Sequence, residues 1–450
     1  MRFRLLRGDA CHAVLRRGRF RCLMGMTDHS DTTEIVVIGG GYAGVMAANR
    51  LRKRQDVTVT LVNPRPRFVE RIRLHQFVAR TRDAALDYDT LLGNGVRLLV
   101  DRATRIDTGA RTVLLASGRV LDYDYVIYAV GSTADSPTSV PGAAEFAHPI
   151  GEWEHAERLR TAIDELARDA RITVVGGGPT GIETAAELAD QGRAVTLVGG
   201  GRLAPTFREP ARRSVLKWLF SNQVEVLEDA RVAKVWPDAV TLADGTVLAG
   251  ALTIWTAGFG VPDLAADSGL PVDALGRLLT DETLTSVGDD RIIAAGDAAA
   301  PSGRPLRMSC QAAAPLGLHA ADTVLARIAG TRPGVLNIGF IGTGISLGRR
   351  AAAVQFTHRD DTAGKLHLGG RWGVPIKEAA SNGAVTGIRK EARNPARSRS
   401  TRVPETGTRC RRRRTSRDDR HYRTRRAVHL AATAVVHDRL RNPGLRDGIR

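Results

Sequence analysis

The sequence contains little cysteine and no long apolar run. Its 450 residues include four cysteines, and three of them, Cys11, Cys22 and Cys410, lie near the ends of the chain. So small and dispersed a set excludes a disulfide framework, and the remaining Cys310 fits a reducing cytoplasm. No apolar segment approaches the roughly 20 residues that a membrane-spanning helix needs.

The excess of positive charge is concentrated at the two ends. The formal net charge is +18, but residues 1–26 carry seven Arg and one acid, and residues 396–450 carry 17 Arg and five acids. Residues 27–395 therefore contain 42 basic and 42 acidic residues. A neutral body gives no indication of the basic surface that nucleic acid requires.

The two ends are predicted to be disordered extensions, covering residues 1–30 and 394–450, because they lack hydrophobic periodicity. Only residues 427–440 have the composition of a short helix. Two alternatives stay open, namely translation from Met24 or Met26 and a shifted reading frame behind the Arg-rich tail.

The body contains an internal duplication. In each copy an apolar segment, 34–38 or 171–175, leads into the glycine pattern G-x-G-x-x-G, an Ala-rich helical stretch and a second strand. Residues 112–131 and 239–258 repeat as well, each with two short strands around a turn and a third strand followed by glycine. The duplication predicts an α/β fold with two Rossmann-like dinucleotide-binding domains, each carrying a β-meander.

The glycine patterns have the chemistry of a pyrophosphate site. The first Gly permits a tight turn, the second lets the backbone approach the phosphates, and the third lets helix and strand pack closely. Exposed N–H groups and the helix dipole then attract the anion. The glycines concerned are Gly39, Gly41 and Gly44 in the first copy and Gly176, Gly178 and Gly181 in the second.

Ribose recognition usually uses an acid after the second strand of such a unit. The two corresponding positions here hold Asn63 and Gly199. Asn63 can still hydrogen-bond a hydroxyl. Gly199 removes the charge that would repel a 2′-phosphate, and Arg202 is near enough in sequence to bind one. The sequence is compatible with either NADH or NADPH as the nucleotide, although Gly181 at the third glycine position favours NADH.

A third element is an apolar strand over 291–295 that ends in Gly296 and Asp297. Asp297 either binds sugar-like hydroxyls or caps the next helix. Together with the duplication, this element resembles the two-dinucleotide flavoproteins, which include disulfide reductases, ferredoxin reductases and type II NADH dehydrogenases. The resemblance covers about residues 33–330.

That resemblance implies two cofactors. FAD would bind at the first glycine pattern, with Asp297 on its ribityl chain and Gly131 beside the flavin. A nicotinamide dinucleotide would bind at the second pattern, with Gly258 closing that domain. Nothing in the sequence indicates a metal site.

The subfamily follows from an absence. No cysteine precedes Cys310 in the body, so the cysteine pair of a disulfide reductase is missing. Residues 179–183 are similar to the nicotinamide-side helix of type II NADH dehydrogenases, and 309–312 are similar to their Ala-Gln signature, with Cys310 in place of Ala. By this resemblance Glu183 positions the nicotinamide and Gln311 bonds near the acceptor.

Simpler interpretations stand beside these roles. Glu183 in the first turn of a helix would be favourable for dipole reasons alone, and Gln311 could be an ordinary helix-start residue. Cys310 is expected to be a small packing residue. Residues 71–75 are expected to form a solvated helix face, with a clamp on FAD phosphates as the alternative.

The predicted domains follow the two copies. An FAD domain is expected at 31–148 and 262–332, a NAD(P)H domain at 149–261, and a small α+β domain at 333–393. In this last domain we expect strands at 340–345 and 351–356 and a helix at 375–380.

The sequence therefore predicts an FAD-dependent oxidoreductase that takes hydride from NAD(P)H and passes electrons to an acceptor, a quinone by resemblance. Rival hypotheses are a ferredoxin-type reductase, and a redox-sensing or nucleic-acid-binding flavoprotein that uses the Arg-rich ends. We expect a cytoplasmic protein. Peripheral contact with the inner face of the membrane and a homodimer stay open, since no convincing amphipathic helix precedes Pro395.

Overall fold

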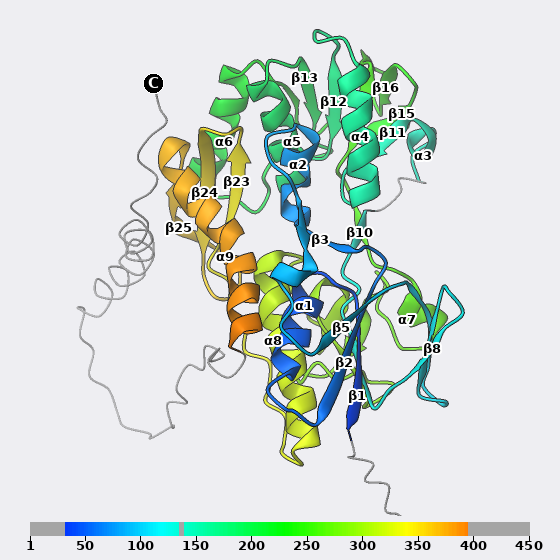
Figure 1. Cartoon of the computed structure of the whole chain (residues 1–450). Helices are drawn as coiled ribbons and strands as arrows, with labels where there is room; N and C mark the ends of the chain where they lie inside the picture. Colours follow the sequence, from blue (N-terminus) through cyan, green and yellow to red (C-terminus); the bar gives the residue numbers. More distant parts are fainter. Residues whose placement is uncertain (1–31, 135–138, 395–450) are drawn as a thin grey trace, which may run out of the picture.

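The computed structural model describes residues 32–134 and 139–394. The helix predicted over 427–440 and nearly all of the two predicted extensions lie outside these ranges. Figure 1 shows one sheet in the lower half of the molecule, a second sheet in the upper half, and a smaller unit beside them.

The lower sheet is parallel and has the strand order β21-β9-β1-β2-β5. Its strands are β1 (Thr33–Ile38), β2 (Val57–Asn63), β5 (Val96–Val100), β9 (Tyr125–Tyr128) and β21 (Ile292–Ala294). Helices α1 (Tyr42–Leu51) and α8 (Cys310–Ile328) pack against each other beside this sheet. Every residue of α1 is buried, which explains why its sequence is rich in small and apolar side chains without a polar face.

The upper sheet repeats the plan with the order β11-β18-β12-β13-β14. All neighbouring strands run parallel, as a sheet covered by crossover helices requires. Its strands are β11 (Ala147–Pro149), β12 (Ile172–Val175), β13 (Val195–Val198), β14 (Glu225–Leu227) and β18 (Leu252–Trp255). Its helices are α4 (Trp153–Glu165), α5 (Pro179–Asp190) and α6 (Glu209–Ser221). The predicted duplication is confirmed.

Each half also carries an antiparallel meander. The strands are β6 (Ala103–Asp107), β7 (Thr112–Leu115) and β8 (Val120–Asp122) below, and β15 (Val232–Val235), β16 (Ala239–Leu242) and β17 (Val247–Ala249) above. The predicted turns are present, and Gly118 and Gly245 occupy them with positive φ angles of 83° and 88°. Sequence analysis found the second and third strand of each meander but missed the first.

The smaller unit has three antiparallel strands and a long helix: β23 (Gly342–Leu347), β24 (Ala351–Thr357), β25 (Ala363–Leu368) and α9 (Gly373–Arg393). The strand expected at 340–345 begins two residues later, β25 was missed, and the helix expected at 375–380 is much longer. Pro375 does not break α9 because it lies in the first turn, where its missing N–H has no helical partner. Helix α9 packs against α1 and β24.

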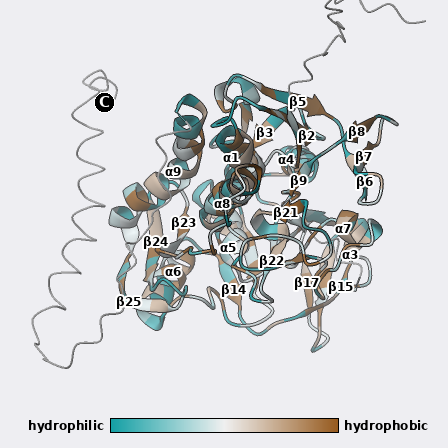
Figure 2. Cartoon of the chain, turned by 90° about the horizontal axis from the view of Figure 1, so that it is seen from below, coloured by the Kyte–Doolittle hydropathy of each residue, from teal (hydrophilic) through white to brown (hydrophobic). Residues whose placement is uncertain are grey.

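Short elements connect these parts. They are β3 (Arg67–Val69), α2 (Leu74–Val78), β4 (Ala85–Asp87), β10 (Thr133–Ala134), α3 (Ala143–Phe146), β19 (Phe259–Gly260), α7 (Leu264–Asp267), β20 (Leu278–Thr280) and β22 (Ala299–Pro301). Within the described ranges, no helix combines the length and the apolar character that crossing a bilayer demands. In Figure 2 the strands of the lower sheet are largely brown, whereas the outer helix α9 shows much teal.

Candidate active site

The first glycine turn joins β1 to α1 and has no room for side chains. Gly39 has φ of 105°, and a Cβ there would lie 2.2 Å from the carbonyl oxygen of Ala129. A Cβ on Gly44 would lie 1.8 Å from the carbonyl oxygen of Gly39. By contrast, a Cβ on Gly41 would meet no atom within 4 Å. The start of α1 is therefore open at Gly41, and no side chain caps it, which fits a pyrophosphate bound by backbone N–H groups.

The second glycine turn, between β12 and α5, has the same geometry. Gly176 has φ of 133°, and a Cβ on Gly181 would lie 1.9 Å from the carbonyl oxygen of Gly176. Gly178 is open, like Gly41, and no side chain caps α5. The chain thus presents two open and uncapped helix starts with the same geometry.

Asn63, at the end of β2, is tied to the first turn. Its Oδ1 accepts a hydrogen bond from the Gly40 N–H at 2.9 Å, and its Nδ2 donates to the carbonyl of Arg65 at 2.8 Å. The Tyr88 hydroxyl donates to the Gly40 carbonyl at 2.8 Å. Asn63 thereby fixes the turn, and the second lone pair of Oδ1 is the acceptor left for the predicted ribose contact.

The edge of the upper sheet contains an acid that sequence analysis missed. Strand β14 pairs Leu227 with Val198, so Glu228 follows at the same edge as Gly199. Glu228 accepts a hydrogen bond from the Leu203 N–H at 2.7 Å and forms an ion pair with Arg212. Burial raises the pKa of Glu228, but Arg212 and the Leu203 N–H lower it by more, so the carboxyl is ionised.

Arg202 was predicted to be available for a 2′-phosphate. In the structure it forms an ion pair with Glu209. The acid beside Gly199 favours NADH over NADPH.

Asp297 lies between the ends of β9 and α8. Its Oδ2 accepts from the Ser132 hydroxyl at 2.8 Å, and its Oδ1 accepts from the Ser309 N–H at 3.1 Å. Arg71 donates to the Ser132 carbonyl at 2.5 Å and to the Gly151 carbonyl at 2.8 Å. Gly131 and Gly258 follow β9 and β18 with φ of 72° and 81°.

The expectation of a solvated helix face at 71–75 is wrong. Residues 71–73 form a 3-10 turn and α2 follows, and the Arg73 and His75 side chains are buried. Arg73 is retained in the interior because it bonds Glu70 and Gln76, at 3.3 and 3.0 Å.

Gln311 is the second residue of α8, two positions after the N-cap Ser309. Its Oε1 is buried and has no hydrogen-bond partner among the described residues. A buried carbonyl oxygen is costly without a donor, so this position is suited to a ligand that supplies one. Burial raises the pKa of the neighbouring Cys310 thiol, which agrees with a packing role.

Glu183 is the fifth residue of α5, so its predicted place in the first turn is wrong. Its Oε1 accepts from Lys377 Nζ at 3.0 Å and from the Ser346 N–H at 2.9 Å, and its Oε2 lies 3.9 Å from His75 Nδ1. Burial would raise the pKa of Glu183, but the Lys377 charge and the Ser346 N–H lower it below its ordinary value. The carboxylate is therefore held ionised in the interior.

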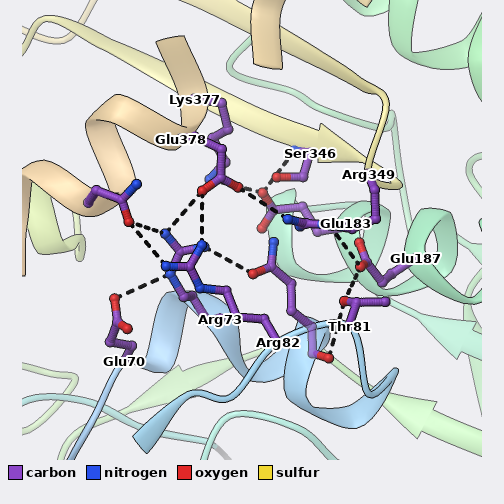
Figure 3. A network of polar contacts seen from close by, with 12 residues as sticks. Glu70, Arg73, Thr81, Arg82, Glu183, Glu187, Ser346, Arg349, Lys377 and Glu378 are labelled. Carbon is purple, nitrogen blue, oxygen red and sulfur yellow. Dashed lines mark hydrogen bonds and ion pairs between the residues drawn. The ribbon is translucent and has the colours of Figure 1, made fainter. Parts of the chain in front are cut away.

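Figure 3 shows that the Glu183 contacts continue into a larger polar cluster. Arg73 reaches Glu378 at 3.2 Å and Asn382 at 2.8 Å on α9, and Thr81 donates to Glu187 on α5. Three distant segments thus meet through polar side chains. Sequence analysis missed the partners because none of them belongs to a motif.

Two glycine turns of one design, with Asp297 and Gln311 between them, define a flavoprotein oxidoreductase with two dinucleotide sites. The chain belongs to the pyridine nucleotide-disulphide oxidoreductase family, which matches residues 33–317. Cys310 is the one free cysteine among the described residues, so the redox cysteine pair of the disulphide-reducing members is absent from them.

Two relatives are informative. An NADH dehydrogenase-like protein of Mycobacterium tuberculosis is 33% identical over 323 residues, 65% of this chain and 80% of the relative. A type II NADH:quinone oxidoreductase of Staphylococcus haemolyticus is 28% identical over 65% of this chain and 82% of the relative.

Solved structures share the fold. The sulfide:quinone oxidoreductase of Aquifex aeolicus superposes with a TM-score of 0.68 at 19% identity, over 80% of this chain and 92% of that one. NDH2 of Plasmodium falciparum, solved with NADH, superposes with a TM-score of 0.68 at 15% identity, over 81% of this chain and 97% of that one.

The chain is accordingly an FAD-dependent oxidoreductase that uses a pyridine nucleotide. The open turn at Gly41 and the Asp297 carboxylate fit FAD, and the open turn at Gly178 fits the nicotinamide dinucleotide. Within the described residues, no group of His, Cys, Asp and Glu is placed to hold a metal ion.

Proposed function

We propose that the chain is a type II NADH dehydrogenase-like enzyme that passes electrons from NADH through FAD to a quinone. The observation that carries the proposal is the buried, unpartnered Oε1 of Gln311 at the start of α8, beside the Asp297 site. The named activity of the Staphylococcus haemolyticus relative supports the same acceptor class. Bound FAD supplies the two-electron redox chemistry.

The protein's own residues hold and orient the two cofactors and the electron acceptor. Asp297 accepts hydrogen bonds from sugar-like hydroxyls, and the glycine turns bind the two pyrophosphates through backbone N–H groups. Glu183, fixed by Lys377 and Ser346, accepts a hydrogen bond from the nicotinamide side and sets its orientation. The Gln311 amide N–H donates to a quinone carbonyl, and its buried Oε1 accepts from the hydroxyl of the reduced quinone, which satisfies that oxygen.

The nucleotide proposed is NADH rather than NADPH. The ionised Glu228 beside the Gly199 turn would repel a 2′-phosphate. The predicted domain boundaries, the Asn63 contact and the roles of Gly131 and Gly258 are part of this proposal.

We further propose a peripheral membrane contact through the smaller unit. Three of its large apolar side chains, Ile341, Leu366 and Trp372, are exposed to solvent by 69%, 44% and 68%. Arg371 lies over the Trp372 ring at 5.0 Å and would meet anionic headgroups. A homodimer stays an expectation.

Anaerobic stopped-flow absorbance tests the proposed cycle. The flavin band should bleach quickly after NADH, more slowly after NADPH, and recover when a water-soluble quinone is added. Gln311→Ala should slow the recovery and leave bleaching unchanged, with Gln311→Asn as the variant that keeps an amide. A ferredoxin-type reductase would bleach with NADH but recover only with a protein acceptor. A flavin that NADH cannot bleach would refute the proposal.

A further inference from the structure

An open pocket beside α2 and α4 has four arginine side chains in its lining. Its volume is about 440 Å³, and these arginines are Arg67, Arg80, Arg82 and Arg160. Phe77 and Trp153 also line it. This pocket is separate from both glycine turns, since no residue of either turn lines it.

Arg160 is the central cation of the pocket. Its guanidinium lies 4.2 Å from the centre of the Phe77 ring, and that ring packs on Trp153 with 4.4 Å between centroids. Arg160 has no ion-pair or hydrogen-bond partner among the described residues, because Asp164, one turn further along α4, pairs with Arg80. The aromatic pair therefore orients a guanidinium whose N–H donors are left for another group.

Arg67 and Arg80 are held by exposed carboxylates. Arg67 pairs with Asp87 at 3.0 Å, and in that pair both side chains are largely exposed. Exposed pairs of this kind add little stability, so an anion with several charges can replace the carboxylates. Arg80 lies two residues after the end of α2 and has a φ of 57°, a left-handed conformation that glycine or asparagine usually adopts.

Two carboxylates line the pocket as well. Asp83 is engaged by the backbone N–H groups of Ala84 and Ala85, at 2.7 and 3.1 Å. Glu157 lies one turn before Arg160 on α4 and forms no ion pair with it. Four guanidinium groups face these two acids, so the lining itself has an excess of positive charge.

We propose that this pocket binds a small phosphorylated anion of nucleoside diphosphate size. Planar guanidinium groups match phosphate oxygens in two-bond forks, which an ammonium group cannot do. The volume lies in the range of roughly 300–1,000 Å³ that small-molecule sites occupy. The proposal does not depend on the electron acceptor.

The inner wall of the pocket connects it to the polar cluster around Glu183. Arg82 bonds Glu378 and Asn382, each at 3.3 Å, and Thr81 donates to Glu187. A bound phosphate would compete with Glu378 for Arg82, and Glu378 is the chain neighbour of the lysine that holds Glu183. Binding in the pocket would thereby change the contacts of Glu183, the residue proposed to orient the nicotinamide.

Isothermal titration of the FAD-loaded full chain with inorganic pyrophosphate, in excess NAD⁺ to fill the dinucleotide site, tests the proposal. Arg160→Ala should weaken pyrophosphate binding on the order of tenfold or more. Arg158→Ala, which removes a charge from α4 outside the pocket lining, should change it less than about twofold. Arg67→Ala, on a different element, should also weaken binding and guards against a folding defect in the Arg160 variant.

Three outcomes would overturn the proposal. Wild-type protein that binds no pyrophosphate, or an Arg160→Ala variant that binds it equally well, would leave no site at this place. Binding to phosphatidylglycerol vesicles, lost in Arg160→Ala, without pyrophosphate binding would assign the pocket to a lipid headgroup instead. Wild-type protein that binds pyrophosphate but does not reduce quinone with NADH would contradict the proposed function and not this site.

Discussion

Lys377 Nζ lies 3.0 Å from Glu183 Oε1, although the two residues belong to α9 and α5, which are far apart in the chain. The Glu183 side chain is almost fully buried, and Lys377 is 16% exposed. Removing one partner would leave the other charge poorly compensated, which is costly in the interior.

The first prediction concerns Glu183→Gln. The neutral amide should lose its hold on Lys377 and misplace the nicotinamide, so flavin reduction by NADH should slow on the order of 10- to 100-fold. Stopped-flow bleaching measures this rate directly. Glu187→Gln, one turn further on α5, is the matched control, because burial raises the pKa of Glu187 and the loss of its charge should cost less there. Equal rates for wild type and Glu183→Gln would contradict the assigned role.

The second prediction concerns stability and His75. Burial lowers the pKa of His75 from 6.5 to about 4, so the folded protein holds a neutral imidazole. Between these values the unfolded chain binds one more proton, and stability should fall as the pH drops, by up to about 1.4 kcal/mol for each pH unit. Urea unfolding at pH 7 and pH 5 tests this slope. His75→Asn should have a shallower slope, and an unchanged slope would refute the assignment to His75.

The third prediction separates cofactor binding from folding. Gly41→Ala places a Cβ in open space at an ordinary φ of −80°, so the apoprotein should melt at the wild-type temperature. The same Cβ should obstruct the pyrophosphate and weaken FAD binding on the order of tenfold or more.

Gly44→Ala is the opposing variant. Its Cβ would meet the Gly39 carbonyl at 1.8 Å, so both the melting temperature and FAD retention should fall. Flavin fluorescence after gel filtration reports retention. Tight FAD binding by Gly41→Ala would show that the pyrophosphate lies elsewhere.

The fourth prediction concerns nucleotide choice. Glu228→Gln removes the acid beside the Gly199 turn and frees the Arg212 guanidinium to meet a 2′-phosphate. The ratio of kcat/KM for NADPH to that for NADH should rise on the order of tenfold. Glu225→Gln, on the same strand but paired with Arg171, is the control. A ratio unaffected by Glu228→Gln would place the ribose away from this edge.

Local patterns explain what could be predicted from the sequence. The glycine turns and the parallel strands follow from residues that are neighbours in the chain, so the fold class and the positions of Gly39 and Gly176 were predictable. The acid next to Gly199 was not predictable, because Glu228 follows the adjacent strand β14. Its place depends on the register between two strands rather than on spacing along one.

The polar cluster was unpredictable for a related reason. Arg73 looked like a surface residue because a buried arginine is rare, and only its tertiary partners Glu378 and Asn382 make burial acceptable. Strand β25 was missed because Lys365 and His367 interrupt its apolar residues. These features arise from packing between segments that are far apart in sequence.

The Ser346 N–H bond to Glu183 limits how this protein can be recombined with its relatives. Helix α5 belongs to the nucleotide half, but its acid is satisfied by β23 and α9. A chimera that exchanges residues 172–190 alone would inherit a carboxylate without its partners. Exchange of 172–190 together with 342–393 would keep Glu183 with Lys377 and Ser346, and adding 70–82 would keep the whole polar cluster, so these separate stretches would have to be exchanged together.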